Sequence, residues 1–319
     1  MPSAQPSTSS GAALGRWLLD PYVCAVLGML IWATGYVLVR DLRADAPAVW
    51  IAFWRNTVAL AIFVAIAFPR IRRDLPAIIA GWKPLARAGF LMVVSGNAAM
   101  TIGLTQTTVV NASIINASEP MIIIVFGWLM YRTRITVRQA AGIALSLAGV
   151  LFLVVRGDPA VLGTLEVNSG DLWCLVAIIS WSLYAAGIRR LPLGDRPFSQ
   201  TIAITFFGEL FLLPWFAWDE ATRPAFQITA DAMLGVVYLG LIASVVALSM
   251  WIRALNLLGP TRASPFVHLL PVFGIILGIV VLGEPMFSYH AVGIALIALG
   301  IYLTSAVRAK LPANTGERA

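Results

Sequence analysis

The chain has 319 residues, of which 60% are hydrophobic and only 12% are charged. Soluble globular proteins carry about 25% charged residues, so this composition excludes an ordinary soluble enzyme or binding domain. The net charge of +7 lies in short loops between apolar runs, which favours the lipid bilayer over nucleic acid as a partner. The two cysteines, Cys24 and Cys174, lie inside apolar segments, so we expect neither a disulfide framework nor a metal cluster.

Ten apolar segments follow residues 1–20, a Ser-, Pro- and Gly-rich stretch that we expect to be disordered. A spanning helix needs roughly 17–25 mainly apolar residues, and backbone in lipid must satisfy its own hydrogen bonds, as helices do. The sequence therefore predicts an all-α membrane protein with ten transmembrane helices and a cytoplasmic tail of residues 308–319. The predicted spans are residues 21–39, 47–68, 86–105, 109–131, 139–155, 171–187, 201–218, 232–254, 263–282 and 290–307.

The first three spans carry aromatic and polar residues inside the apolar runs. Trp32 and Tyr36 lie one helical turn apart and are predicted to stack on a ligand in a cavity, with plain helix packing as the alternative. Arg55 is a cation at a depth where charge is costly; it either ties helices together or holds a substrate carboxylate. Asn97 and Thr101 form a polar stripe that faces the predicted cavity or joins helices by hydrogen bonds.

The fourth span contains the strongest candidate for a substrate or proton contact. Asn116 and Glu119 share one helical face, and we predict that both bind substrate. The alternative for Glu119 is a neutral carboxyl group packed between helices. Pro120 cannot donate a backbone hydrogen bond, so the carbonyl of Asn116 loses its helical partner and a gating kink is predicted there.

The second half of the chain contains a matching set of residues. Trp181 and Tyr184 repeat the aromatic face of the first span, and Pro271 repeats the proline of the fourth. Glu209 is a second carboxyl group inside a span, with a structural role as the alternative to function. His268 is predicted to contact substrate, or else to bond to a backbone carbonyl in the core.

Lys and Arg are distributed unequally between the two sides of the predicted spans. With the N-terminus in the cytoplasm, 17 of the 22 basic residues fall on the cytoplasmic side and Arg55 lies within a span. The positive-inside rule therefore predicts an inner-membrane protein with both termini in the cytoplasm. The opposite side holds only Arg40, Arg43, Arg156 and Arg223.

The two halves of the chain repeat each other. A shift of 151 positions overlays the fourth and fifth spans on the ninth and tenth without a gap, matching Pro120 with Pro271 and Gly142 with Gly293. Each half has five predicted spans, an odd number, so the second repeat is inverted in the membrane. Inverted repeats recur in secondary transporters, with the substrate site at the repeat interface. The predicted repeats are residues 21–155 and 171–307.

Several segments resemble the EamA-type branch of the drug/metabolite transporter superfamily. They are MLIWATGYVLVR around Trp32, FWRNTVAL around Arg55, GDLWCLVAIISWSLYAAGIRR and LLPVFGIILGIVVLGEPMFSYHAVGIALIALGIYL. The segment that starts at Phe68, FPRIR, also resembles YddG-type exporters of aromatic and neutral amino acids. In the first repeat, Arg132 and Thr133 stand where the family usually has Gly-Glu. The resemblance implies export of small metabolites through a central cavity between the repeats.

No motif in the sequence indicates catalysis or a cofactor. There is no Walker A sequence, and the two histidines, His268 and His290, have no metal-ligand spacing. We therefore expect a secondary transporter, not an enzyme, that exports neutral or aromatic amino acids by alternating access, with protons as a candidate partner and a monomer favoured. The alternatives are export of nucleosides, purines or cationic drugs, a passive channel, and a membrane-embedded enzyme.

Overall fold

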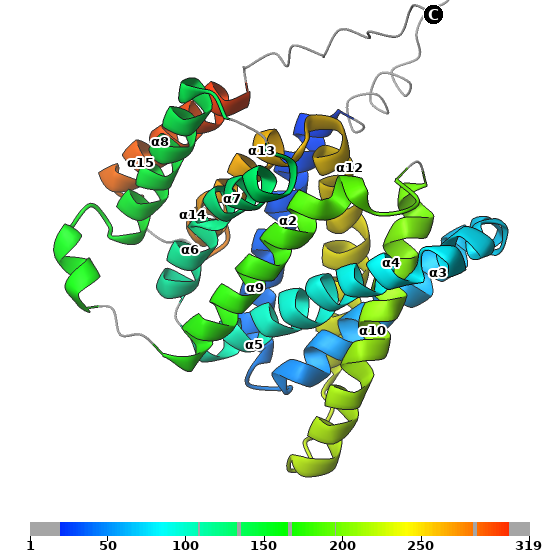
Figure 1. Ribbon diagram of the computed structural model, residues 1–319. Coiled ribbons are helices and arrows are strands. Elements are labelled where there is room, and N and C mark those ends of the chain that lie inside the picture. Colours follow the sequence, from blue (N-terminus) through cyan, green and yellow to red (C-terminus); the bar gives the residue numbers. More distant parts are fainter. Residues whose placement is uncertain are drawn as a thin grey trace, which may run out of the picture.

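The computed structural model describes residues 20–107, 109–132, 135–164, 168–194, 196–282 and 286–305. Every regular element within these residues is helical, and the helices form one bundle (Figure 1). The predicted disorder before Asp20 and the predicted tail at 308–319 lie outside the described residues.

The helices follow one another with short connections. Segments η1 and η4 are π-helical, and η2, η3 and η5 are 3-10 helices. The first half contains α2 (Pro21–Leu42), α3 (Ala48–Ala80), α4 (Trp82–Gly89), η1 (Phe90–Ala98), α5 (Ala99–Gln106), α6 (Val109–Ala117), α7 (Glu119–Tyr131) and α8 (Val137–Val154). The remainder contains η2 (Pro159–Thr164), α9 (Ser169–Gly187), η3 (Ile188–Arg190), α10 (Pro197–Thr222), α11 (Ala230–Tyr238), η4 (Leu239–Ala247), α12 (Leu248–Leu258), α13 (Pro260–Ala263), η5 (Ser264–His268), α14 (Leu269–Leu282) and α15 (Ser288–Ser305).

Eight helical stretches in the described residues are long and apolar enough to cross a membrane. The prediction of spanning helices is therefore confirmed for eight of the ten segments. The fourth and tenth segments form shorter apolar helices, Ile115–Tyr131 and Ser288–Thr304. The eight stretches are Pro21–Leu42, Ala48–Ala80, Trp82–Gln106, Val137–Val154, Ser169–Gly187, Pro197–Thr222, Ala230–Leu258 and Pro260–Leu277.

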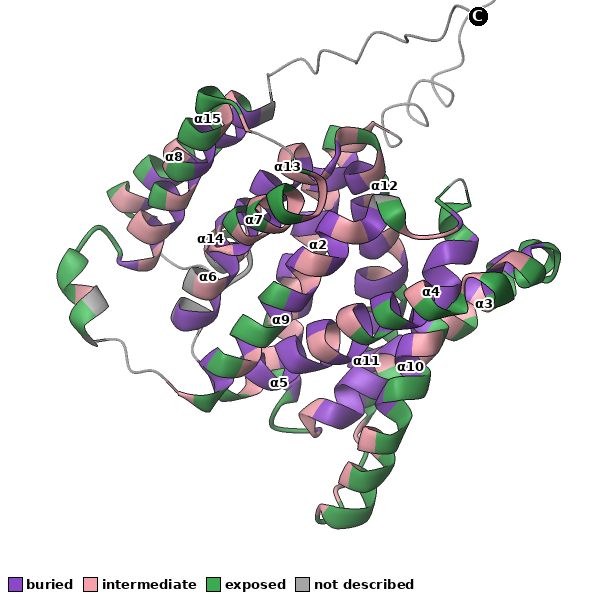
Figure 2. Cartoon of the chain, in the orientation of Figure 1, coloured by how far each residue is buried: buried purple, intermediate pink, exposed green. Residues whose placement is uncertain are grey.

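Large apolar side chains cover the outside of the bundle. Ile66, Leu234 and Val280 are 65%, 69% and 76% exposed, and Figure 2 shows exposed residues along the outward faces of the helices. Contiguous apolar surface of this kind marks contact with another apolar phase. Together with the spanning helices, it identifies a multi-pass membrane protein.

Polar residues define several helix starts. The Asp20 carboxylate accepts hydrogen bonds from the backbone N–H groups of Tyr22 and Val23, at 2.8 and 3.2 Å. Helices α8 and α9 each begin with a capping box, formed in α9 by Asn168 and Asp171. Such caps satisfy N–H groups that the first helical turn leaves without a partner.

Contacts between the two halves occur in matched pairs. Helix α8 packs against α15, and α3 packs against α10. Helix α9 contacts α5, η1 and α7, whereas α2 contacts α12, η4 and α14 in the same relation. If each helix is replaced by the equivalent helix of the other half, every main contact therefore becomes either the same contact or another contact that is also observed. The helices of one half are interleaved with those of the other, so neither half forms a separate body.

Glycines bring α8 and α15 into close contact at the edge of the bundle (Figure 1). A Cβ atom added to Gly142 would lie 2.6 Å from the carbonyl oxygen of Gly300. The repeat-related contact is also tight, because a Cβ atom on Gly149 would lie 2.9 Å from the carbonyl oxygen of Gly293. Small residues at helix crossings are the usual means of tight packing in membranes.

Four of the predicted spans contain a break or an irregular helical turn. The π-helical segments η1 and η4 interrupt the third and eighth spans. The fourth span breaks at Ser118, two residues before Pro120, and the ninth contains η5, which ends three residues before Pro271. Prolines remove a helical hydrogen bond, and π-helical turns are frequent at functional sites. All four irregular spans contribute side chains to the cavity described next.

Candidate functional site

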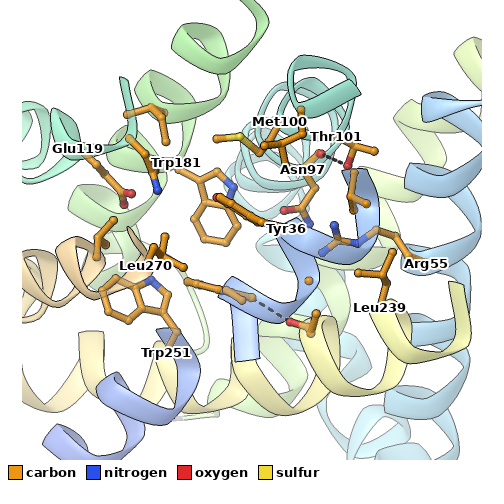
Figure 3. A pocket seen from close by; sticks show the side chains of 18 residues that line it. Tyr36, Arg55, Asn97, Met100, Thr101, Glu119, Trp181, Leu239, Trp251 and Leu270 are labelled. Atoms are coloured by element: carbon orange, nitrogen blue, oxygen red, sulfur yellow. Dashed lines mark hydrogen bonds between the residues drawn. The ribbon is translucent and has the colours of Figure 1, made fainter. Parts of the chain in front are cut away.

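A cavity of about 60 Å³ lies between the two halves of the protein (Figure 3). Its lining comes from α2, α3, η1, α5, α6 and α7 of the first half, and from α9, η4, α12, η5 and α14 of the second. The structure brings eight of the residues singled out from sequence into this lining. They are Trp32, Tyr36, Arg55, Asn97, Thr101, Asn116, Glu119 and Trp181.

Indole rings form one wall of the cavity. The ring of Trp32 meets those of Trp181 and Trp251 edge to face, with centroids 5.8 Å apart in both pairs. The Trp32 indole N–H donates to the carbonyl of Ala243 in η4, at 3.0 Å, which fixes the ring. Gly96 makes room for the indole ring of Trp181, because a Cβ atom on Gly96 would lie 2.9 Å from that ring. Such rings offer faces for stacking and for cations.

Hydrogen-bond donors gather at the end of the cavity formed by α3, η1 and α5. The Arg55 guanidinium donates from Nε and Nη2 to the Ser244 hydroxyl, at 3.3 and 3.2 Å. The side-chain amide of Asn97 donates to Asn56, at 3.4 Å. The Thr101 hydroxyl donates to the Asn97 carbonyl, at 2.8 Å. Arg55 thus joins α3 to η4 and at the same time presents a positive charge to the cavity.

Hydrogen-bond acceptors gather at the end of the cavity formed by α6 and α7. Glu119 is the first residue of α7 and is 7% exposed, and no described residue donates a hydrogen bond to its carboxylate. The amide oxygen of Asn116, one turn earlier, is buried and also lacks a partner among the described residues. Asn116, near the end of α6, and Glu119, at the start of α7, both line the cavity. A buried acceptor without a donor costs about 1–3 kcal/mol, so this end favours a ligand that donates.

Two predicted substrate residues lie outside the lining. Tyr184 is buried behind Trp181, with ring centroids 5.6 Å apart. His268 is 1% exposed, and its ring nitrogens lie 2.7 Å from the Ser146 hydroxyl and 3.0 Å from the Ala117 carbonyl. These contacts match the alternative of a core histidine bonded to backbone. Substrate contact by either residue stays a prediction that the cavity geometry does not support.

Glu209 also lies outside the main cavity. It is 8% exposed on α10, and its Oε1 accepts a hydrogen bond from the Thr57 hydroxyl of α3, at 2.7 Å. This contact joins the second and seventh spans, which favours a structural role. Among the described residues, no group of three or more His, Cys, Asp or Glu side chains is placed to hold a metal ion.

Several lining residues were not predicted from sequence. Leu239 and Ala243 reach the cavity because they belong to η4, and a π-helical segment has no clear sequence signature. Met100 lies among ordinary apolar residues. Trp251 lies three residues from the end of the predicted span 232–254, where the interfacial belt is the ordinary explanation of a tryptophan, so the sequence did not indicate its place on the cavity.

Comparisons with known proteins agree with this architecture. A protein of Bacillus subtilis named as the uncharacterized transporter YyaM is 23% identical over 84% of this chain and 87% of its own length. An Escherichia coli protein named a probable amino-acid metabolite efflux pump is 25% identical over 88% of this chain and 93% of its own. A crystal structure with 19% sequence identity superposes with a TM-score of 0.72 and covers 89% of this chain and 96% of that one, which shows a shared fold.

The family comparison finds the same unit twice in one chain. The model of the EamA-like transporter family matches residues 21–155 and again residues 168–306. Together the two matches cover most of the chain. The chain belongs to the EamA-like transporter family.

Proposed function

We propose that the protein is a secondary transporter that exports small metabolites by alternating access, through ten spans arranged as two inverted five-helix repeats. The observation that carries this proposal is the cavity between the halves, whose lining includes Arg55 and Glu119 from two apolar helical segments. Polar groups in such positions are costly and mark transport pathways. The matched contacts between the halves also support a two-fold relation, which is typical of transporters with inverted repeats.

The small volume of the cavity favours a transporter whose helices move during transport over a channel that stays open. A volume of about 60 Å³ holds only a few water molecules, because each needs roughly 10–15 Å³ measured in this way. An amino acid therefore enters only when helices around the cavity move apart. The irregular turns near Pro120 and Pro271 lie in the spans that border the cavity and are our candidates for the hinges.

The distribution of Lys and Arg supports a location in the inner membrane with both termini in the cytoplasm. In this orientation the loop between α3 and α4 is cytoplasmic, and the loop between α10 and α11 is on the opposite side. Export then carries substrate from the side rich in basic residues to the other side. A monomer contains both halves of the cavity, so we propose a monomeric transport unit.

Amino acids are the substrate class that we propose. The related efflux pump is named for amino-acid metabolites, and the indole wall suits the neutral or aromatic side chains expected from the resemblance. The lining also contains Arg55, which can bind the carboxylate that every amino acid carries, and Glu119, which can bind an ammonium group. Protons are the proposed coupling ion, because Glu119 is a titratable group on the cavity surface.

Counterflow in proteoliposomes tests the proposal. Vesicles preloaded with one unlabelled compound are diluted into buffer containing the same radiolabelled compound, with amino acids, nucleosides and quaternary ammonium drugs as separate sets. A transporter accumulates label transiently above equilibrium. A passive channel only equilibrates it, and a membrane-embedded enzyme changes the labelled compound chemically. We expect transient accumulation of amino acids; equilibration or conversion would refute the proposed function.

A further inference from the structure

The guanidinium group of Arg55 and the carboxyl group of Glu119 stand at opposite ends of the cavity. Figure 3 shows Arg55 on one side and Glu119 on the other, with Tyr36 and Trp181 between them. None of the ion pairs among the described residues joins Arg55 to Glu119. The helices that carry the two charges have different main neighbours: α3 packs against α10 and η4, whereas α7 packs against α9 and α13.

The two ends also differ in hydrogen-bonding character. At the Arg55 end, the guanidinium supplies donors and suits a carboxylate, which only accepts. At the Glu119 end, the carboxylate and the amide oxygen of Asn116 are acceptors without described donors. An ammonium group has three donors and no acceptor, so it satisfies this end. The molecule that satisfies both ends therefore has a carboxylate at one end and an ammonium group at the other.

A neutral amino acid does not have that form. Its ammonium and carboxylate groups are attached to the same carbon atom, so they stay together and satisfy one end only. The rings of Tyr36 and Trp181 between the two ends require an apolar spacer, such as a chain of methylene groups. Indole faces also attract cations that approach them, which helps an ammonium group reach the acceptor end.

The geometry points to amino acids whose side chain ends in a cationic amine, of the lysine and ornithine type, as the preferred substrates. Their carboxylate binds Arg55, their methylene stem lies along the indole wall, and their terminal ammonium binds Glu119 and Asn116. This inference rests on the proposed export of amino acids and, within that class, favours basic amino acids over the neutral and aromatic ones expected from the resemblance.

Three closely related compounds test the inference in the counterflow assay. Lysine has both charged ends, norleucine lacks only the side-chain ammonium, and cadaverine lacks the carboxylate. We expect lysine to exchange at least about tenfold faster than either of the other two, which corresponds to about 1.4 kcal/mol per lost contact. Exchange of norleucine or phenylalanine as fast as that of lysine would overturn the inference and leave the export function standing. Exchange of none of the compounds would overturn both.

Two variants assign each charged end to its residue. Glu119→Gln should reduce the preference for lysine over norleucine to about one, while Arg55→Gln should remove the preference for lysine over cadaverine. Glu220→Gln and Arg72→Gln are matched controls on exposed side chains and should keep both preferences. Unchanged preferences in Glu119→Gln and Arg55→Gln would refute the assignment.

Thermal stabilisation by ligand gives a second measurement that needs no transport. Millimolar lysine should raise the unfolding temperature of the wild-type protein in detergent more than equal concentrations of norleucine or cadaverine, because a ligand stabilises the folded state to which it binds. The difference should disappear in Glu119→Gln. Equal stabilisation of the wild type by all three compounds would contradict the inference.

Discussion

The fourth and ninth spans occupy equivalent positions in the two halves but present different chemistry to the cavity. Shifted by 151 positions, Asn116 falls on Val267 and Glu119 on Leu270, and all four residues line the cavity. One copy is polar and the other is apolar. The duplicated backbone therefore supplies the shape of the cavity, whereas single substitutions in one copy supply its charge.

The fifth and tenth spans behave in the opposite way. Helices α8 and α15 pack through glycines that are equivalent in the two halves, Gly142 with Gly293 and Gly149 with Gly300. Here both copies keep the same residue, because any side chain would collide with the backbone of the partner helix. Packing preserves the symmetry of the repeats, and the cavity departs from it.

Inversion of the repeats gives the largest expected effect, an all-or-none difference in labelling. Ala80, the last residue of α3, and Ala230, the first residue of α11, are exposed residues beside equivalent connections of the two halves, and an inverted repeat places them on opposite sides of the membrane. In intact cells, an impermeant maleimide should label Ala230→Cys but not Ala80→Cys. The native Cys24 and Cys174 are buried, so background labelling should be low. Labelling of both variants from outside would rule out inversion.

Adding a methyl group at the glycine contact between α8 and α15 should destabilise the protein, whichever of the two helices carries the substitution. Gly142→Ala places a Cβ atom 2.6 Å from the Gly300 carbonyl oxygen, and Gly293→Ala places one against the side chain of Leu153. We expect each to lower the free energy of unfolding by about 1–3 kcal/mol, as overpacking does. Unfolding in detergent measures the effect. Gly163→Ala, which meets nothing within 4 Å, is the control, and equal stability of all three would contradict the packing.

Removing the carboxylate of Glu119 from the fourth span should slow transport by about tenfold or more, which corresponds to a free-energy difference of about 1.4 kcal/mol. Glu119→Gln keeps the shape of the side chain while it removes the carboxylate from the cavity. Glu209→Gln makes the same change outside the cavity, where the Thr57 hydroxyl still finds an acceptor, and should have a smaller effect. Initial rates in proteoliposomes compare the two variants. A larger loss in Glu209→Gln would move the functional carboxyl group to α10.

The prolines near the irregular turns should have the smallest effect. Replacing Pro120 and Pro271 together with alanine restores two backbone donors and stiffens both spans. We expect transport to slow by about threefold while the unfolding temperature stays the same or rises, because conformational steps often limit turnover. Transport at the wild-type rate in the double variant would show that the prolines serve packing alone.

Much of the architecture follows from the sequence. The apolar runs predict the spanning helices, because only helices satisfy backbone hydrogen bonds in lipid. Residues such as Asn97, Glu119 and Arg55 attracted attention because polar groups are costly at that depth, and the structure places all three on one cavity. Repetition of Pro120 as Pro271 exposed the duplication that the family comparison finds again.

Other features of the site depend on tertiary packing. Tyr184 and Trp181 are three residues apart, but only Trp181 faces the cavity, since Tyr184 lies behind it. His268 contacts Ser146 and the Ala117 carbonyl and does not line the cavity. The sequence could not predict these contacts, because both partners belong to spans that are distant in sequence. Periodicity shows which residues share a face of one helix, but not which neighbour that face meets.

The sequence by itself determined that this protein crosses the membrane, that it contains two related halves and that a few polar residues lie at membrane depth. Only the tertiary structure decided that Arg55 and Glu119 lie at opposite ends of one cavity, with aromatic rings between them. The physical reason is that the free-energy cost of burying a polar group or leaving it without a hydrogen bond in lipid applies to each segment separately. It is therefore visible in the composition of that segment. The relative position of two charges depends on how helices from both halves pack together.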